Sequence, residues 1–211
     1  MAFSDDVNTR YDCYDKHTRM IFPEVQASPR HQGAGTVTPM IKEMFLERVG
    51  VDIENFSGGP AEARTAFAEA IQAMGPAVGA DFSDLNEEQM CDDFHYTIFP
   101  NVTFNTHSMF VWVFLHRPHP TDPNKMFFDF FNLSNTPALD TERPKRLFFK
   151  ATADFKMGDA FPGGEVLDED LYNLPRVQQG MNTSAFENLH LNEQEIRILH
   201  FHQTLMDYLN A

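Results

Sequence analysis

Alternating apolar and polar residues predict a group of strands in the middle of the chain. Three apolar segments there have the length of strands and lie close together, at residues 94–104, 108–116 and 125–133. Turn-forming residues separate them, namely Asn101, residues 105–106 and the run HRPHPTDPN at 116–124. Loops of this length join antiparallel neighbours, so the pattern predicts an antiparallel sheet.

Weaker signals flank this group. Residues 8–22 mix aromatic residues and threonine with charges and predict one extended strand before Pro23. Residues 146–155 are a further possible strand, and the Gly-containing acidic stretch at 158–170 predicts a loop. The acidic stretch at 81–93 predicts a solvated helical turn, with a docking face for a basic partner as the alternative.

Two segments between the first strand and the sheet have apolar residues at the three- and four-residue steps of helices. The first begins with Thr38 as N-cap before Pro39 and runs to about Gly50. The second, residues 60–74, is rich in alanine and is expected to stop at the Gly-Pro pair that follows. We expect these two helices to pair.

The C-terminal segment predicts the longest helix, over residues 192–208. Asn192 and Glu195 form a capping-box pattern at its start. The side expected to pack under the sheet is the apolar one, with Ile196, Leu199 and Met206. Strands followed by a closing helix, with two helices inserted early, predict an α+β fold with a curved antiparallel sheet.

Composition places the chain among globular proteins. Its 211 residues, 42% hydrophobic and 22% charged, suit one domain over residues 1–211, and the longest apolar run, at 109–115, is too short to cross a bilayer. Lys and Arg number 16 against 31 Asp and Glu, which leaves a net charge of -15. Phosphate backbones and anionic lipid would be repelled, so we expect neither a nucleic acid nor a membrane as partner.

The two cysteines and the N-terminus indicate the compartment. Cys13 and Cys91 show no CxxC or CxH spacing, which argues against a disulfide framework and a cysteine-ligated metal. The first twelve residues carry acids where a secretory signal has bases, so a cytoplasmic location is expected. The 21 Phe and 11 Met suggest a thick apolar interior or a ligand cavity, and a plain core explains them equally well.

A polar row inside the predicted sheet is the first candidate for chemistry. Period-two alternation puts Asp93, His95 and Thr97 on one face of their strand. Such a row needs partners, which are either hydrogen bonds within the core or a ligand in a cavity, and both alternatives stay open.

The densest carboxylate cluster lies in EVLDEDLYNLPRVQQGM, residues 165–181. It is a candidate for a metal ligand, although composition alone favours a solvated loop. The histidine pairs 116/119 and 200/202 do not have the spacing of a shared metal site, because prolines interrupt the first and the second points to two sides of a helix. GxGxxG, GxxxxGK[ST] and GxSxG patterns are absent from the sequence.

Three stretches of the chain, in this order, resemble one known family: HYTIFPN at 95–101, EDLYNLPRVQQGM at 169–181 and EIRILHFHQTLMDYL at 195–209. The family is the C-terminal catalytic domain of the alpha subunit of Rieske non-haem iron ring-hydroxylating oxygenases. The resemblance implies the helix-grip (Bet v 1/START-like) fold, an antiparallel sheet over a long C-terminal helix. It also implies an oxygenase that hydroxylates an aromatic or other apolar compound with dioxygen.

The resemblance also implies site residues, a cofactor and partners. Asp170, between Glu169 and Asn173, matches the carboxylate that holds the catalytic Fe(II), and Asp93 and His95 would line the substrate pocket. We therefore expect Asp93, His95 and Asp170 to converge on one cavity lined by Phe and Met. A ferredoxin or reductase would supply electrons, and a homo-oligomer of the family's trimer type is expected.

The chain departs from the family at two points. The two histidine ligands of the iron, an HxxxxH pair, have no counterpart in the sequence, and neither do the CxH and CxxH pairs that hold the 2Fe-2S Rieske cluster. The resemblance would place the histidine pair just before Met1, so an N-terminally truncated chain is expected, one that binds iron weakly alone. The alternative function is a non-catalytic helix-grip module that binds a hydrophobic small molecule.

Overall fold

The computed structural model describes residues 5–31, 33–137, 145–149, 156–161 and 163–211. The chain divides into two compact units. One consists of Met1–Thr141 together with Leu191–Ala211, and the other of Glu142–His190. The sheet belongs to the first unit and the predicted carboxylate cluster to the second.

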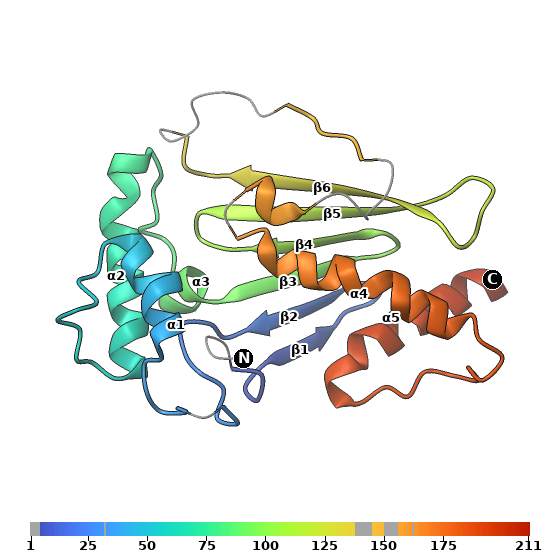
Figure 1. The fold of residues 1–211 in the computed structure, drawn as a ribbon, viewed down its shortest axis with the longest axis horizontal. Helices are drawn as coiled ribbons and strands as arrows, with labels where there is room; N and C mark the ends of the chain where they lie inside the picture. Colours follow the sequence, from blue (N-terminus) through green and yellow to red (C-terminus); the bar gives the residue numbers. More distant parts are fainter. Residues whose placement is uncertain (1–4, 32, 138–144, 150–155, 162) are drawn as a thin grey trace. The chain divides into compact units, whose positions relative to one another are not determined.

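The first unit is built on a six-stranded antiparallel sheet whose strands lie side by side in sequence order (Figure 1). The strands are β1 (Arg10–Cys13), β2 (Thr18–Phe22), β3 (Asp93–Ile98), β4 (Val102–Thr106), β5 (Phe110–Pro118) and β6 (Met126–Ser134). The predicted α+β class with an antiparallel sheet and a C-terminal helix is confirmed, and the arrangement is consistent with the helix-grip fold.

Some predicted strand limits are wrong. Residues 8–22 form a hairpin of β1 and β2 rather than one strand, and the backbone N–H of Tyr14 donates to the His17 carbonyl at 2.8 Å across its turn. Asn105 and Thr106 lie within β4 rather than in a turn, because both pair with strands on either side. Residues 146–149 form no strand, and the rest of that prediction lies outside the described residues.

The helices inserted between β2 and β3 begin where the sequence predicts. The Thr38 hydroxyl accepts from the Ile41 N–H at 3.3 Å and caps a continuous helical segment. It consists of α1 (Pro39–Ile41), a π-helical turn (Lys42–Leu46) and a 3-10 turn (Glu47–Val49), and it ends at Gly50 with a φ of 84°. This confirms the predicted helix up to Gly50.

Helix α2 (Pro60–Val78) does not stop at Gly75. It continues past Pro76 and ends at Gly79, whose φ of 74° is left-handed. Gly75 is needed for packing instead, since a Cβ there would meet the Ala80 carbonyl oxygen at 2.8 Å. The Gly75-Pro76 pair therefore marks a place where two backbone segments approach closely, not the end of the helix.

The main core lies between these helices and the loops around them. The rings of Phe45 and Phe67 pack edge to face at 5.6 Å, which confirms that the two helical segments pair. The buried cluster consists of Val25, Ala27, Ile41, Leu46, Ala63, Phe67, Ala68, Ile71, Val78, Phe82, Met90 and Cys91.

The acidic stretch before β3 includes helix α3 (Glu87–Cys91), capped by a box between Asn86 and Gln89. Glu87 and Glu88 are exposed, in agreement with the predicted solvated turn. The next two acids differ, because Asp92 and Asp93 are buried at the start of β3.

The C-terminal helix α5 (Ile196–Asn210) and the capping box of Asn192 with Glu195 are confirmed. The predicted buried side is wrong: Ile196, Leu199 and Met206 are 43%, 43% and 52% exposed. The side of α5 that contacts the rest of the first unit is the neighbouring one. There, Phe201 and Tyr208 pack against the Phe99 ring and Thr204 is buried. This side faces the sheet because it also carries Arg197, which forms hydrogen bonds with polar side chains of β2 and β3.

The second unit contains a 3-10 turn (Met157–Asp159) and helix α4 (Glu165–Met181). The predicted loop at 158–170 is wrong in its second half, because α4 begins at Glu165. Asp168 ties the two elements together by accepting from the Met157 and Gly158 N–H groups at 2.6 and 3.1 Å.

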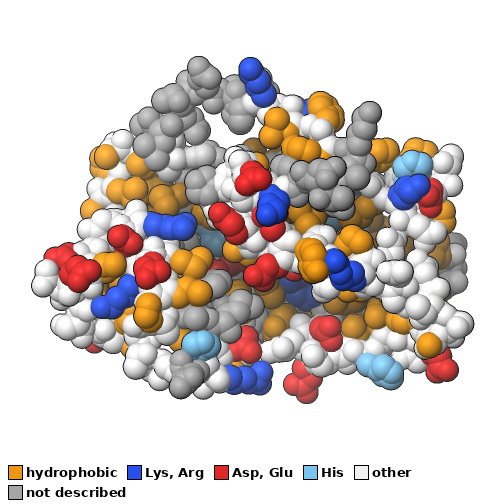
Figure 2. Space-filling view, viewed as in Figure 1, with side chains coloured by type: hydrophobic (Ala, Val, Ile, Leu, Met, Phe, Trp, Pro, Cys, Tyr) orange, Lys and Arg blue, Asp and Glu red, His pale blue; other side chains and the backbone are white. Residues whose placement is uncertain are grey.

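Charged groups are spread over the molecular surface. On the face drawn in Figure 2, the Lys and Arg side chains of the described residues lie singly among acidic and apolar ones. No described helix has the length and apolar character needed to cross a membrane.

Candidate functional site

The predicted polar row on β3 exists, and the sheet register shows its neighbours. His95 lies opposite Met20 on β2 and Asn105 on β4, and Thr97 lies opposite Thr18 and Thr103. Directly opposite residues share a face, so the row continues across three strands.

The same face becomes aromatic toward the far edge of the sheet. Asn105 pairs with Trp112 and Thr103 with Phe114, and the rings of both aromatic residues contact Phe130 on β6, at 6.1 and 5.3 Å. We call this the polar–aromatic face, formed by Thr18, Met20, Asp93, His95, Thr97, Thr103, Asn105, Trp112, Phe114, His116, Phe128 and Phe130. A polar half beside an aromatic half suits an apolar compound that carries one polar group.

Arg197 of α5 organises the polar half. Its Nη2 donates to His95 Nδ1 at 2.6 Å and to the Thr97 hydroxyl at 2.9 Å, and its Nε donates to the Thr18 hydroxyl at 2.9 Å. Sequence reasoning missed Arg197, because it is 102 residues away from His95 along the chain.

The contact with Arg197 defines the protonation of His95. An arginine side chain can only donate, so Nδ1 of His95 must accept, and the ring hydrogen lies on Nε2. Burial, together with the nearby charges of Arg197 and His116, lowers the pKa of His95 to about 4. At neutral pH His95 is therefore a neutral ring whose Nε2–H points away from Arg197.

Asp93 belongs to a second buried cluster. One oxygen, Oδ2, accepts from the Asn105 amide at 2.6 Å, whereas the buried Oδ1 has no hydrogen-bond partner among the described residues. His107 lies between two acids, with Nε2 3.7 Å from Asp93 Oδ1 and Nδ1 4.0 Å from Glu24 Oε2. This places three titratable groups in a row at the end of β3.

Burial controls the charge of this cluster. It raises the pKa of Asp93 to about 6 and lowers the pKa of His107 to about 4. Burial also raises the pKa of Glu24, and the neighbouring Asp93 and Asp92 raise it further. Sequence reasoning missed Glu24 and His107; the alternation of polar residues at 103, 105 and 107 was the available signal for the histidine.

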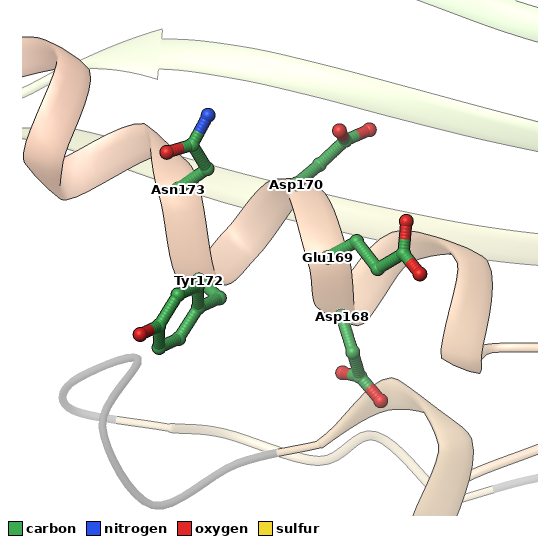
Figure 3. A pocket seen from close by; sticks show the side chains of 5 residues that line it. All are labelled: Asp168, Glu169, Asp170, Tyr172 and Asn173. Atoms are coloured by element: carbon green, nitrogen blue, oxygen red, sulfur yellow. The ribbon is translucent and has the colours of Figure 1, made fainter.

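Asp170 lies in the second unit, on the exposed surface of α4. Figure 3 shows its side chain and that of Asn173 on one side of the helix, while those of Asp168 and Tyr172 point to the other. These four residues and Glu169 line an open pocket of about 590 Å³. Asp168 holds backbone N–H groups, whereas Asp170 forms no hydrogen bond or ion pair with a described residue, so its carboxylate is free to bind a ligand.

Comparison with known proteins gives the family. The family model described as the ring hydroxylating alpha subunit (catalytic domain) matches residues 17–211. The chain belongs to this family. Searches of the curated proteins and of the solved structures gave no match. The resemblance inferred from the three stretches is confirmed, and the chain is an oxygenase-type catalytic domain.

A ring-hydroxylating catalytic domain is expected to hold a mononuclear iron, and the donor set tests how far this chain suits it. Asp170 supplies one free carboxylate. The described residues contain no group of three His, Cys, Asp or Glu side chains placed to hold a metal ion. They do not complete a set of two histidines and one carboxylate.

Replacing Asp93 with asparagine is expected to change the pH dependence of stability. The folded protein holds a proton on Asp93 up to a pKa of about 6, against the usual 3.8 of an aspartic acid, so it binds more protons than the unfolded chain between these values. Stability from this group falls as pH rises through that window, by up to about 3 kcal/mol. Asp93→Asn should therefore match the wild type near pH 4 and be more stable at pH 7.5, measured by urea denaturation.

His95 and His107, whose pKa values are lowered by burial, make stability rise with pH, which is opposite to the effect of Asp93. Both proteins contain these histidines, so their contribution cancels when the two stabilities are compared. The exposed Asp84→Asn serves as control and should leave the difference near zero at both pH values. A constant difference between wild type and Asp93→Asn across the range would contradict the prediction.

Proposed function

We propose that this chain is the substrate-binding and catalytic-iron domain, over residues 1–211, of an oxygenase that hydroxylates an aromatic or other apolar compound with dioxygen. The observation that carries the proposal is the free Asp170 carboxylate within EDLYNLPRVQQGM, inside the region matched by the ring-hydroxylating family. Asp170 would bind Fe(II), and Asp93 and His95 would bind the substrate.

The polar–aromatic face supports this division of roles. Its aromatic half would receive the apolar body of the substrate, and His95 would donate a hydrogen bond from Nε2–H to a polar group. Asp93 would hold a proton beside this group only below a pH of about 6, since burial raises its pKa to about 6. Bound iron would supply the activation of dioxygen, which no protein side chain provides.

Other components would have to come from outside this chain. The sequence holds no CxH and CxxH pairs, so the 2Fe-2S Rieske cluster is not carried here, and a ferredoxin or reductase would deliver electrons. A homo-oligomer and a cytoplasmic location accompany the proposal. Convergence of Asp93, His95 and Asp170 on one cavity stays a prediction.

The alternative is a non-catalytic module that binds a hydrophobic small molecule. One observation favours it, namely that the described residues form no three-ligand metal group. The motif around Asp170, with Glu169 and Asn173 as neighbours inside the matched region, favours the oxygenase.

Anaerobic titration with ferrous iron, followed by calorimetry, tests the proposal. We expect the 211-residue chain to bind iron weakly, since one carboxylate competes poorly with water for the ion. A longer protein that carries an HxxxxH segment upstream in the same reading frame should bind iron stoichiometrically and lose it on Asp170→Ala.

The control is Glu169→Gln, which removes the adjacent carboxylate and should leave iron binding unchanged. Iron retained by Asp170→Ala in the longer protein would overturn the ligand role. Tight binding by the 211-residue chain would point to other ligands, with His95 and His107 the first to replace.

A further inference from the structure

A surface hollow lies in the first unit, on the segment that joins β2 to α2. Its volume is about 560 Å³, and the side chains that line it come from residues 31–44. Among them are two methionines, Met40 and Met44, one histidine, His31, and one acid, Glu43. The hollow therefore combines sulfur, nitrogen and oxygen donors within one short segment, and it contains none of the residues assigned to iron or substrate.

The two methionines present their side chains to the same space. They are four positions apart on one helical segment, a spacing that brings side chains to the same side of a helix, and both line the hollow. Met40 is 41% exposed and Met44 is half-buried, and neither belongs to the main core cluster. Their thioether groups are therefore accessible to a ligand rather than used up in core packing.

The helical segment is irregular where Met44 lies. After Ile41, α1 passes into the π-helical turn of Lys42–Leu46, and turns of this kind are rare and frequent at functional sites. The ammonium group of Lys42 is held elsewhere, because Nζ donates to the carbonyls of Ile53 and Phe56 at 3.2 and 3.1 Å. No Lys or Arg of the described residues lines the hollow, so no lysine or arginine charge there opposes a bound cation.

His31 has a fixed backbone and an uncommitted ring nitrogen. Its N–H donates to the Ser28 carbonyl at 2.9 Å, and its carbonyl accepts from the Ala34 N–H at 2.9 Å. The ring atom Nδ1 is buried and has no hydrogen-bond partner among the described residues. A buried nitrogen without a partner needs an explanation, and a bound ion provides one.

The donor types decide which cation this hollow suits. Hard cations such as Mg²⁺ and Ca²⁺ are held by several oxygen ligands, whereas the described lining contains a single carboxylate, that of Glu43. Thioether sulfur is a soft ligand that selects Cu(I), and imidazole also binds copper. Two thioethers beside one imidazole therefore favour a soft ion over a hard one.

We propose that Met40, Met44 and His31 form a binding site for a soft monovalent cation, Cu(I), with Glu43 balancing its charge. This site is separate from the proposed oxygenase function, and neither its residues nor its test depend on it. The competing explanation is a plain surface hollow in which the methionines only cover apolar side chains. Only the proposal predicts that both sulfurs respond to the same ion.

Ag(I) is the probe, because it has the charge and softness of Cu(I) and is stable in air. The 211-residue chain is labelled with carbon-13 at the methionine methyl groups and carries Cys13→Ser, since an exposed thiol would bind Ag(I) first. NMR titration in chloride-free buffer follows each methyl signal. We expect the Met40 and Met44 signals to shift together and to reach their limit at one ion per chain, and Mg²⁺ to shift neither.

Replacing a proposed ligand should weaken Ag(I) binding. Met40→Leu and Met44→Leu keep the side-chain volume and remove the sulfur, so the fold is retained while the dissociation constant rises at least about tenfold. In each of these variants the remaining methionine signal should need more Ag(I) to shift. His31→Gln should also raise the dissociation constant and leave both methyl groups able to respond, since the two sulfurs remain.

Met126→Leu is the matched control. Met126 is 50% exposed and lies on β6, outside the hollow, so its replacement should leave the affinity unchanged and its own signal should not move with the first ion. Equal shifts of Met126, Met40 and Met44 would overturn the proposal, because they would show unspecific binding to exposed thioethers. So would still Met40 and Met44 signals at one ion per chain, or an affinity of Met44→Leu or His31→Gln equal to that of the parent.

Discussion

Arg64→Ala is expected to lower the free energy of unfolding by about 3–5 kcal/mol, because it removes one partner of a buried ion pair. The side chains of Arg64 and Asp92 are 11% and 3% exposed, and Nη1 lies 2.6 Å from Asp92 Oδ1. The same Nη1 donates to the Glu24 carbonyl at 2.6 Å, so a backbone acceptor also loses its donor. Urea denaturation at pH 7 measures the loss.

The exposed pair of Arg10 with Glu88 provides the control. Its side chains are 52% and 53% exposed, so Arg10→Ala should cost no more than about 1 kcal/mol. Equal losses in the two variants would show that Asp92 does not depend on Arg64. Arg64→Ala combined with Asp92→Asn should recover part of the loss, since no buried carboxylate is then left without its partner.

Phe82→Ala should cost about 3–5 kcal/mol, the usual loss for a large ring removed from a packed core. Phe82 is 2% exposed and belongs to the main core cluster. Its ring lies beside Gly75, where an added Cβ would come within 3.2 Å of it. The cavity left by the ring cannot close easily, because α2 already approaches the Ala80 backbone there.

Thermal and urea unfolding of Phe82→Ala measure this effect. The control is Phe148→Ala, which removes a ring that is 81% exposed and should change stability by less than about 0.5 kcal/mol. A loss below about 1 kcal/mol for Phe82→Ala would mean that the core around α2 relaxes into the space, contrary to the packing described.

Elements with local signals could be predicted from the sequence. Thr38 and Asn192 cap the helices that they were expected to cap, because a cap depends on residues three or four positions away. The polar row of Asp93, His95 and Thr97 followed from strand alternation alone. The family followed from three short stretches, including the one around Asp170, and the matched region contains all three.

Contacts between distant residues were decided by the tertiary structure. Apolar spacing identified α5, but it assigned the wrong side to the sheet, because it cannot register that the opposing face presents Thr18, His95 and Thr97. Arg197 satisfies those groups and turns Ile196 and Leu199 outward. The Gly-Pro signal in α2 was misread for a similar reason, since only the folded chain brings the Ala80 carbonyl against Gly75.

The sequence by itself determined the elements, their class and the family, because caps, periodicity and motifs act over a few neighbouring residues. Only the tertiary structure decided which charges are balanced. Arg64 and Asp92 are 28 residues apart, and Arg197 and His95 are 102 apart, yet one arginine obtains a carboxylate and the other a neutral ring. Burial then sets the charge states of Asp93, His95 and His107, since desolvation depends on what the whole fold packs around each group.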